Sequence, residues 1–342
     1  MIVMNWKQRI SRISFYLIPF VFLLGIAVSI FIFRDQKTKS DLFLQKVPQK
    51  PWHELIPALK QARVFVVDRP HDPEELKHPD DLSQSKRIRS FYISTNEMGL
   101  RHPPIGSKEK FRILCVGESV TFGWGVDVKD SYPAQLSRIL GVDAINAGIP
   151  SARIEQSKVW IQKHAKALDA DLILLTYRPD WNQANAINNF VAAIKDIQKI
   201  VHPIPLGLIL SPISSFDIKG LQYAQKEEQE LPAKLGSIAL LNLSPIFREQ
   251  KTEFGVRLIV KENQQKLINV NDGMTIVDVS TNASLQRHNR LAPQILLAFE
   301  ENANIHEPFI FDGGHPDEQG YLLMAEQVAQ WILRNRWYRS EK

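Results

Sequence analysis

The chain has 342 residues, of which 44% are hydrophobic and 23% are charged, and its formal net charge is +5. This is an ordinary globular composition, and the small, dispersed positive excess does not indicate a nucleic-acid-binding protein. The one cysteine, Cys115, excludes an intramolecular disulfide, and its apolar neighbours predict a buried strand residue.

The first predicted element is a transmembrane helix over residues 13–33, after a short basic N-terminus at residues 1–12. No residue of the stretch is charged, and about 20 apolar residues are enough to span a bilayer. A cleaved signal peptide is the alternative, because Ala27-Val28-Ser29 resembles a weak cleavage site. We expect an uncleaved anchor, and therefore a single-pass protein that meets the membrane through its N-terminal helix.

Positive charges flank the predicted span on both sides, so the positive-inside rule does not decide its orientation. They are Lys7, Arg9 and Arg12 before the span, and Arg34, Lys37, Lys39, Lys46 and Lys50 after it. A short basic N-terminus before a long apolar run is typical of a signal anchor, and large following domains translocate largely regardless of charge. We predict an extracytoplasmic, periplasmic location for the bulk of the chain. A cytoplasmic orientation stays open, because the charge rule taken literally favours it.

Residues 34–102 are predicted to form a polar connector interrupted by prolines. Within this connector, residues 52–62 are a candidate helix and residues 62–67 a candidate strand. The charge-rich run at residues 72–89 is typical of a solvated loop. The connector is expected to space the following domain from the membrane.

Residues 103–342 have the pattern of an α/β domain, in which apolar runs alternate with amphipathic segments. The predicted strands are 111–116, 142–146, 171–177, 206–210 and 274–279. The predicted helices are 131–140, 154–168, 184–201 and 317–335, with 221–247 read as helix and loops. This alternation predicts a mostly parallel sheet with helices on both faces. Functional groups in such sheets gather at the carboxyl ends of the strands.

Ser119 follows the first of these strands, in the segment GESVTFG at residues 117–123. A serine on a turn between a strand and a helix presents its Oγ at the edge of the sheet. The N–H groups of the same turn can stabilise an oxyanion. Serine is also an ordinary turn and N-cap residue, so this motif has little weight by itself.

His315 lies at the last strand-to-helix junction, in the segment FDGGHP at residues 311–316. Asp312 precedes it by three residues and can bond to Nδ1, which would orient the imidazole. The alternative is that Asp312 is a helix N-cap and His315 a surface residue. Because both motifs lie at strand ends of one domain, we predict Ser119 as nucleophile, His315 as base and Asp312 as the orienting acid.

These segments resemble the blocks of the GDSL/SGNH hydrolase family, over residues 111–337. The family's first block, G-D-S followed by a glycine, is similar to residues 117–123, with Glu118 where aspartate is usual. Its last block, D-x-x-H, is similar to residues 312–315, and STNEMGLR at residues 94–101 resembles a lead-in of many membrane-anchored members. The resemblance implies a three-layer, flavodoxin-like α/β fold after one transmembrane helix. It also implies a serine esterase. The sequence has no nucleotide-binding fingerprint and no metal-ligand spacing, so we expect neither a cofactor nor a metal.

The resemblance implies an oxyanion hole as well. The N–H groups of Ser119 and of Gly148, which ends the second block NAG, take the role of donors. The family's third block, G-x-N-D, is replaced by YRPDWN at residues 177–182. Direct alignment places Pro179 at the asparagine, whereas alignment with a W-N-D variant makes Asn182 the third donor. If Asn182 points away, two backbone donors remain, and losing one donor costs typically about 100- to 1000-fold in rate.

Arg178 and Trp181 are the candidate substrate-binding residues. Arg178 can bind an anionic group or pair with Asp180, and Trp181, like Trp124, can stack on a sugar ring or fill the core. The predicted anchor and the resemblance imply an O-acetyl ester on an envelope glycan, hydrolysed through an acyl-enzyme. Three alternatives stay open: glycan O-acetyl transfer, hydrolysis of a lipid or lysophospholipid ester, and a degenerate domain that only binds glycan or acts as a scaffold.

Overall fold

The computed structural model describes residues 43–46, 53–67, 88–213, 218–247, 256–261, 264–269, 275–278, 309–310 and 314–338. The predicted transmembrane helix at residues 13–33 lies outside them, as does Asp312. Among the helices within these ranges, none is both long enough and apolar enough to cross a bilayer. The chain divides into residues 1–44 and a larger unit, Gln45–Lys342, which contains the sheet and the candidate site.

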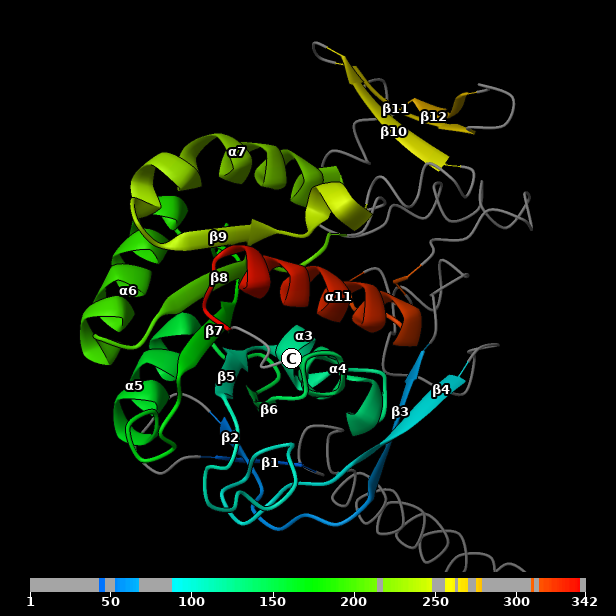
Figure 1. Cartoon of the computed structure of the whole chain (residues 1–342). Helices are drawn as coiled ribbons and strands as arrows, with labels where there is room; N and C mark the ends of the chain where they lie inside the picture. The colour runs from blue at the N-terminus through cyan, green and yellow to red at the C-terminus, as the bar shows by residue number, and fades with distance from the viewer. Residues whose placement is uncertain are drawn as a thin grey trace, which may run out of the picture. The chain divides into compact units, whose positions relative to one another are not determined.

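A five-stranded parallel sheet forms the centre of the larger unit (Figure 1). Its strands are β5 (Arg112–Gly117), β6 (Asp143–Gly148), β7 (Leu172–Thr176), β8 (Leu206–Leu210) and β9 (Ala239–Asn242), in the order β6-β5-β7-β8-β9. Every residue of β5, β7 and β8 is buried, as expected for parallel strands covered on both faces. The strand order reverses between β5 and β7, and ligands of such sheets bind in the crevice beyond the carboxyl ends at this point.

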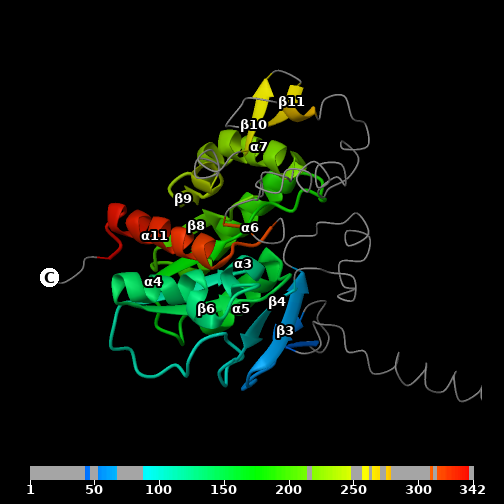
Figure 2. The same cartoon turned by 90° about the vertical axis from the view of Figure 1, so that its right-hand side faces the viewer.

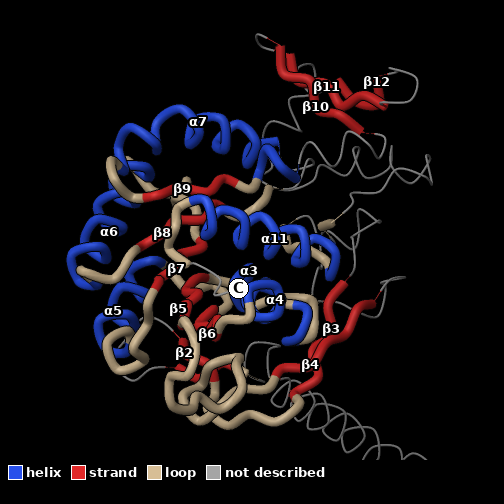
Figure 3. The backbone as a smooth tube through the Cα atoms, viewed as in Figure 1, coloured by secondary structure: helices blue, strands red, loops and turns tan. Residues whose placement is uncertain are grey.

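Helices cover both faces of the sheet (Figures 1 and 2). One layer contains α4 (Tyr132–Leu140) and α11 (Glu318–Arg334), and the other contains α5 (Ile154–His164), α6 (Ala186–Val201) and α7 (Ile218–Leu235). Alternate residues of β5 point to opposite layers, because Leu114 belongs to the buried cluster that contains Ile194 and Ile113 to the one that contains Met324. Figure 3 shows that strands and helices alternate along this part of the chain. The predicted α/β fold with a parallel sheet between two helical layers is confirmed.

Cys115 belongs to the first of these strands and is fully buried, which confirms its prediction as a strand residue. Burial raises the pKa of its thiol to about 12. The thiol is therefore protonated at neutral pH, and a thiolate is the form that reacts.

The fifth strand of the sheet was not predicted. The structure ends α7 at Leu235 and places Gly236 in the left-handed conformation, with φ +68°, which is a common way to end a helix. The segment that follows contains the strand β9, where residues 221–247 were predicted to be helix and loops only. The strand predicted at residues 274–279 is β12 (Thr275–Asp278). It belongs to a separate antiparallel sheet with β10 (Val256–Lys261) and β11 (Gln264–Asn269).

The predicted helix at residues 52–62 is wrong. Ala58 and Gln61 have φ values of 53° and 49°, which a right-handed helix excludes, and β2 (His53–Leu55) lies in this segment. The predicted strand at residues 62–67 is confirmed as β3 (Ala62–Val67). It pairs with β4 (Ile88–Ile93), a strand that the sequence patterns did not indicate. One further short strand, β1 (Leu44–Lys46), precedes them.

Candidate active site

Ser119 is the first residue of α3 (Ser119–Phe122), a single helical turn that begins just after β5. The last residue of β5, Gly117, is flanked by Gly148 of β6 and Thr176 of β7. A Cβ atom at Gly117 would lie 2.1 Å from Thr121 Oγ1 and 2.7 Å from the carbonyl oxygen of Thr176. Glycine is therefore needed for the chain to turn here, and this turn places Ser119 at the carboxyl edge of the sheet.

His315 reaches Ser119 from the C-terminal part of the chain. Pro316 forms an antiparallel bridge with Ile310, and Asp317 accepts a hydrogen bond from the N–H of Gly320 at 2.8 Å and so caps α11. These contacts hold the segment in which His315 Nε2 lies 2.8 Å from Ser119 Oγ. This is the hydrogen-bond distance required between a nucleophile and its general base.

Asp312 lies outside the described residues, so its role as the orienting acid stays a prediction. The alternative, with Asp312 as N-cap and His315 on the surface, is contradicted because Asp317 is the N-cap and His315 is half-buried. Since Nε2 contacts the serine, Nδ1 is the ring nitrogen that an orienting carboxylate would hold.

Trp124 packs against the catalytic candidates from the side of β4. Its ring centroid lies 6.2 Å from that of His315 and 5.4 Å from that of Phe91, which it meets edge-on. The hydroxyl of Tyr321 donates to the carbonyl oxygen of Trp124 at 3.4 Å. Of the two roles predicted for Trp124, packing within the protein is the one that these contacts support.

Gly148, the predicted second oxyanion donor, has a side-chain partner in this structure, and its role at the oxyanion stays a prediction. Its N–H donates to Asn146 Oδ1 at 3.0 Å, and Asn146 Nδ2 donates to the carbonyl oxygen of Phe122 at 3.2 Å. A Cβ at Gly148 would lie 2.1 Å from the nitrogen of Phe122, so glycine is needed here to let α3 pack on β6. The N–H of Ser119 remains a candidate donor, because the first N–H groups of a helix have no partner within it.

The loop after β7 contains Asn182, the predicted third donor. Its backbone N–H donates to Asp180 Oδ1 at 3.1 Å, and Gln183 Nε2 donates to Asp180 Oδ2 at 2.9 Å. Asp180 therefore shapes this loop as an Asx turn. Asn182 is not among the residues that line the adjoining pocket. Its role as an oxyanion donor stays a prediction.

Arg178 and Trp181, the predicted substrate-binding residues, both bind a buried carboxylate, that of Glu227. Arg178 Nη1 forms an ion pair with Glu227 of α7, whose side chain is 0% exposed, and Trp181 Nε1 donates to Glu227 Oε1 at 2.8 Å. Arg178 also donates to the carbonyl oxygen of Ser211 and to Ser244 Oγ. A buried carboxylate needs such partners. Arg178 also lines the pocket described below, so the substrate-binding role of Arg178 and Trp181 stays a prediction.

Trp181 is further held by a stacked ring. Its centroid lies 4.4 Å from that of Tyr223, with 5° between the ring planes, and Lys226 Nζ lies 5.6 Å from its ring. Trp181 thus packs the loop after β7 onto α7. The role of filling the core is the one that the structure supports.

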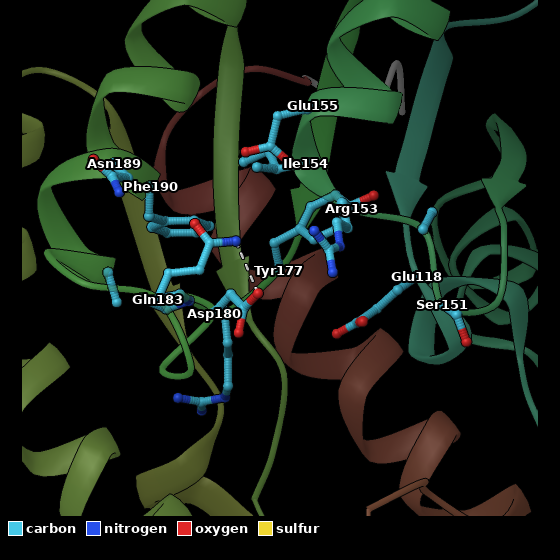
Figure 4. A pocket seen from close by; sticks show the side chains of 14 residues that line it. Glu118, Ser151, Arg153, Ile154, Glu155, Tyr177, Asp180, Gln183, Asn189 and Phe190 are labelled. Atoms are coloured by element: carbon cyan, nitrogen blue, oxygen red, sulfur yellow. Dashed lines mark hydrogen bonds between the residues drawn. The ribbon is translucent and has the colours of Figure 1, made fainter. Parts of the chain in front are cut away.

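A pocket of about 260 Å³ is lined by Glu118, the residue before Ser119, whereas Ser119 and His315 are not among its lining residues (Figure 4). It is bounded by the ends of β5 and β7, by the loop from Ser151 into α5, and by the first turns of α6. Figure 4 shows Glu118 and Arg153 on one side of it, and Asp180 and Gln183 on the other. Glu155 and Asn189 add further polar groups to its lining.

Glu118 connects this pocket to the nucleophile, because it precedes Ser119 directly and its side chain forms no cap bond with α3. Burial raises the pKa of its carboxyl above the ordinary value, although the electrostatic effects of His315 and Arg178 act in the opposite direction. Ser151, drawn beside Glu118 in Figure 4, has φ 61° in a turn after Pro150. A non-glycine residue in this conformation is uncommon and is often associated with function.

Within the ranges that the structure describes, no three His, Cys, Asp or Glu residues lie close enough together to hold a metal ion.

No family model and no curated protein matches the chain. Among solved structures, a lipase/acylhydrolase from Enterococcus faecalis is similar at 14% identity and a TM-score of 0.42, with 68% of this chain and 99% of that one covered. A GDSL-like lipase from Bacteroides thetaiotaomicron is similar at 15% identity and a TM-score of 0.37, with 66% and 89% covered. Similarity this distant leaves the function to be inferred from the chain's own residues.

Proposed function

We propose that this protein is a serine esterase of the GDSL/SGNH type, which hydrolyses carboxylic esters. The observation that supports this most directly is the 2.8 Å distance between His315 Nε2 and Ser119 Oγ. The two residues lie at the carboxyl edge of a parallel sheet, beside the point where its strand order reverses. A domain that only binds glycan does not need a nucleophile and a base at this distance.

The reaction follows from the positions of these groups. His315 accepts the proton of Ser119 Oγ as the oxygen attacks the ester carbonyl carbon, and the N–H of Ser119 donates to the resulting oxyanion. Collapse of the tetrahedral intermediate breaks the bond to the alcohol, which leaves with the proton from His315. Water then attacks the acyl-enzyme with His315 again as base, and this releases the acid and restores the serine. Asp312 is proposed to orient the imidazole throughout.

Covalent labelling tests the proposal. The full-length protein, purified in mild detergent, should react with a fluorophosphonate, and peptide mass spectrometry should locate the adduct on Ser119. The His315→Ala variant should label much more slowly, because the serine then lacks its base. An intact, folded protein that neither labels nor hydrolyses an aryl acetate would instead indicate a degenerate binding or scaffold domain.

We further propose an O-acetyl ester on a glycan as the substrate, since the pocket favours a small hydrophilic group. A fatty acyl chain in this pocket would desolvate Glu118, Arg153 and Asp180 without replacing their hydrogen bonds with water, which is costly. Sugar hydroxyl groups can donate to carboxylates and accept from a guanidinium. Acetyl transfer to a second glycan uses the same serine and base, and a product analysis that finds acetylated acceptor in place of free acetate would favour it.

Arg153 offers a test of this substrate class, because it is exposed at the pocket. Arg153→Ala should raise KM for an O-acetylated oligosaccharide by about 10-fold or more, the effect of one lost charge-assisted hydrogen bond. Hydrolysis of an aryl acetate, which is too small to need this contact, should stay within about twofold. The matched control is Arg138→Ala on α4, another exposed arginine that does not line the pocket. Faster hydrolysis of an aryl octanoate than of the acetate would refute the glycan proposal and favour a lipid ester.

The proposed location is a membrane, with the esterase domain outside the cytoplasm. The uncharged run at residues 13–33 supports the anchor. A reporter that is active only outside the cytoplasm, fused after Lys342, would be inactive if the domain faced the cytoplasm.

A further inference from the structure

We propose that Arg101 is a positioning residue for the nucleophile, and that the lead-in segment at residues 88–103 is part of the active site. Part of its test rests on the proposed esterase function, because kcat is one of the readouts. The structural part does not rest on that function. The sequence patterns assigned this segment to a connector, with only spacing as its role.

Arg101 is 0% exposed, and none of the carboxylates in the described ranges forms an ion pair with it. Its guanidinium donates to main-chain carbonyl oxygens instead. Nη1 donates to Phe122 at 2.9 Å and Gly123 at 2.7 Å, while Nη2 donates to Tyr92 at 2.9 Å and Val126 at 2.6 Å. One side chain thereby connects β4 to both ends of the turn at residues 122–126.

That turn ends the helix on which the nucleophile lies. α3 has four residues, so its last carbonyl groups have no partner in a following helical turn. Arg101 and Asn146 provide the partners for Phe122. Gly123 has φ 87°, and a Cβ there would lie 2.6 Å from Ser131 Cβ and 3.0 Å from Arg101 Nη1. The end of α3 is thus fitted closely around the guanidinium.

The aromatic residues beside the site also pack on Arg101. Its Cζ lies 4.5 Å from the ring centroid of Phe122 and 5.5 Å from that of Phe91. Phe91 is the residue whose ring meets Trp124, which in turn packs against His315. Arg101 therefore contacts the supports of both the nucleophile and the base.

The segment that carries Arg101 is itself held in one conformation. Asn96 Oδ1 accepts hydrogen bonds from the N–H groups of Met98 and Leu100, each at 3.0 Å, and its Nδ2 donates to the carbonyl oxygen of Pro103 at 3.1 Å. Gly99 has φ 74° within this turn. The STNEMGLR segment thus forms a rigid turn that directs Arg101 into the domain.

Burying an arginine carries a large free-energy penalty, because its charge must be desolvated. An apolar side chain of similar volume is often as stabilising. Burial lowers its pKa to about 10, so the guanidinium stays charged at neutral pH. Its directional hydrogen bonds are what an apolar residue cannot supply. A displacement of about 1 Å at a reacting group can lower the rate about 100-fold. A side chain that only holds the nucleophile in place can therefore have a large effect on kcat.

The test compares Arg101→Met, Arg101→Lys and the control Arg63→Met in the full-length protein. Arg63 lies on β3, next to β4, and its guanidinium contacts Ser90 at the surface rather than α3. Fluorophosphonate titration counts the competent serines in each preparation, so that kcat is expressed per titrated site. Hydrogen exchange at residues 119–126 reports the order of the turn independently of any activity.

For Arg101→Met we expect kcat per titrated site to fall by about 10- to 100-fold with little change in KM, and exchange at residues 119–126 to accelerate. Arg101→Lys should recover part of both, since it restores a cation with fewer donors. Arg63→Met should resemble the wild type. A role limited to stability would lower the melting temperature and the number of titrated sites but leave kcat per site unchanged, and that result would overturn the proposal. Should the wild type prove to be no esterase, unaltered exchange in Arg101→Met would overturn it as well.

Discussion

Ser119→Ala is expected to lower kcat for an aryl acetate by about 10⁴- to 10⁶-fold while leaving the protein folded. The hydroxyl oxygen is the atom that bonds to the acyl group, so its loss removes the covalent route rather than weakening it. Ser119 is half-buried in a single helical turn, and alanine is compatible with a helix at this position. The measurement is the rate of acetate release, together with circular dichroism of the same samples.

The combination of Ser119→Ala with His315→Ala gives a sharper result. Because His315 acts through the serine, from which its Nε2 lies 2.8 Å, the double variant should be about as inactive as Ser119→Ala alone. The matched control is Ser237→Ala, an exposed serine in the turn before β9 that does not line the pocket, and it should retain wild-type activity. Two losses that multiply would show that the residues act separately, and hydrolysis that survives Ser119→Ala would exclude Ser119 as the nucleophile.

The position of Ser119 at the sheet edge could be anticipated because it follows β5, whereas the approach of His315 came from motif resemblance, since an isolated bridge between Ile310 and Pro316 and no strand of the parallel sheet adjoins it in the described residues. The apolar runs of β5, β7 and β8 were long enough to predict, and the residues that follow them were therefore expected to approach one another. β9 escaped prediction because Ala239–Asn242 is short and only partly buried, and the helix before it continues through Pro232. Gly236 was the sequence signal that could have marked the end of α7 and the start of a separate strand.

The side chains around the nucleophile could not be predicted in the same way, because their partners are distant in sequence. Glu227 belongs to a polar stretch of α7 that resembles a solvated helix face. Only the fold brings it into an ion pair with Arg178. Arg101 was visible as part of the lead-in, yet its carbonyl partners lie on β4 and on the turn after α3. The hydrogen bond from Gly148 N–H to Asn146 Oδ1 could not be predicted either, because a motif identifies a position and not the direction of its N–H.

Glu227→Ala is expected to lower the free energy of unfolding by about 3–5 kcal/mol, because it leaves a buried guanidinium without its counter-charge. Trp181 Nε1 also loses its acceptor, which lies at 2.8 Å in the wild type. Denaturation followed by tryptophan fluorescence measures the effect. The control is Glu230→Ala on the same helix, whose carboxylate lies 3.9 Å from Lys226 and 3.8 Å from Lys234 at the surface. Surface pairs of this kind contribute about 0–1 kcal/mol.

The Arg178–Glu227 pair is also expected to position the active site more than it stabilises the fold. Burial raises the pKa of Glu227 above its ordinary value despite the adjacent guanidinium, so the charged form is disfavoured on balance. A carboxyl group whose pKa is raised by folding contributes stability below its unfolded pKa and loses it as the pH rises through the folded value. At neutral pH this ionisation therefore adds little to stability.

An apolar replacement of both partners separates positioning from stability. Arg178→Met combined with Glu227→Leu should be less destabilising than Glu227→Ala, because no unpaired charge remains. It should nevertheless lower kcat per titrated site, since Arg178 lies in the loop that carries Asn182 and borders the pocket. If the double variant were as unstable as Glu227→Ala, the main role of the Arg178–Glu227 pair would be to stabilise the fold. If it were fully active, the loop would not depend on the pair for its position, and the search for the third oxyanion donor would move away from Asn182.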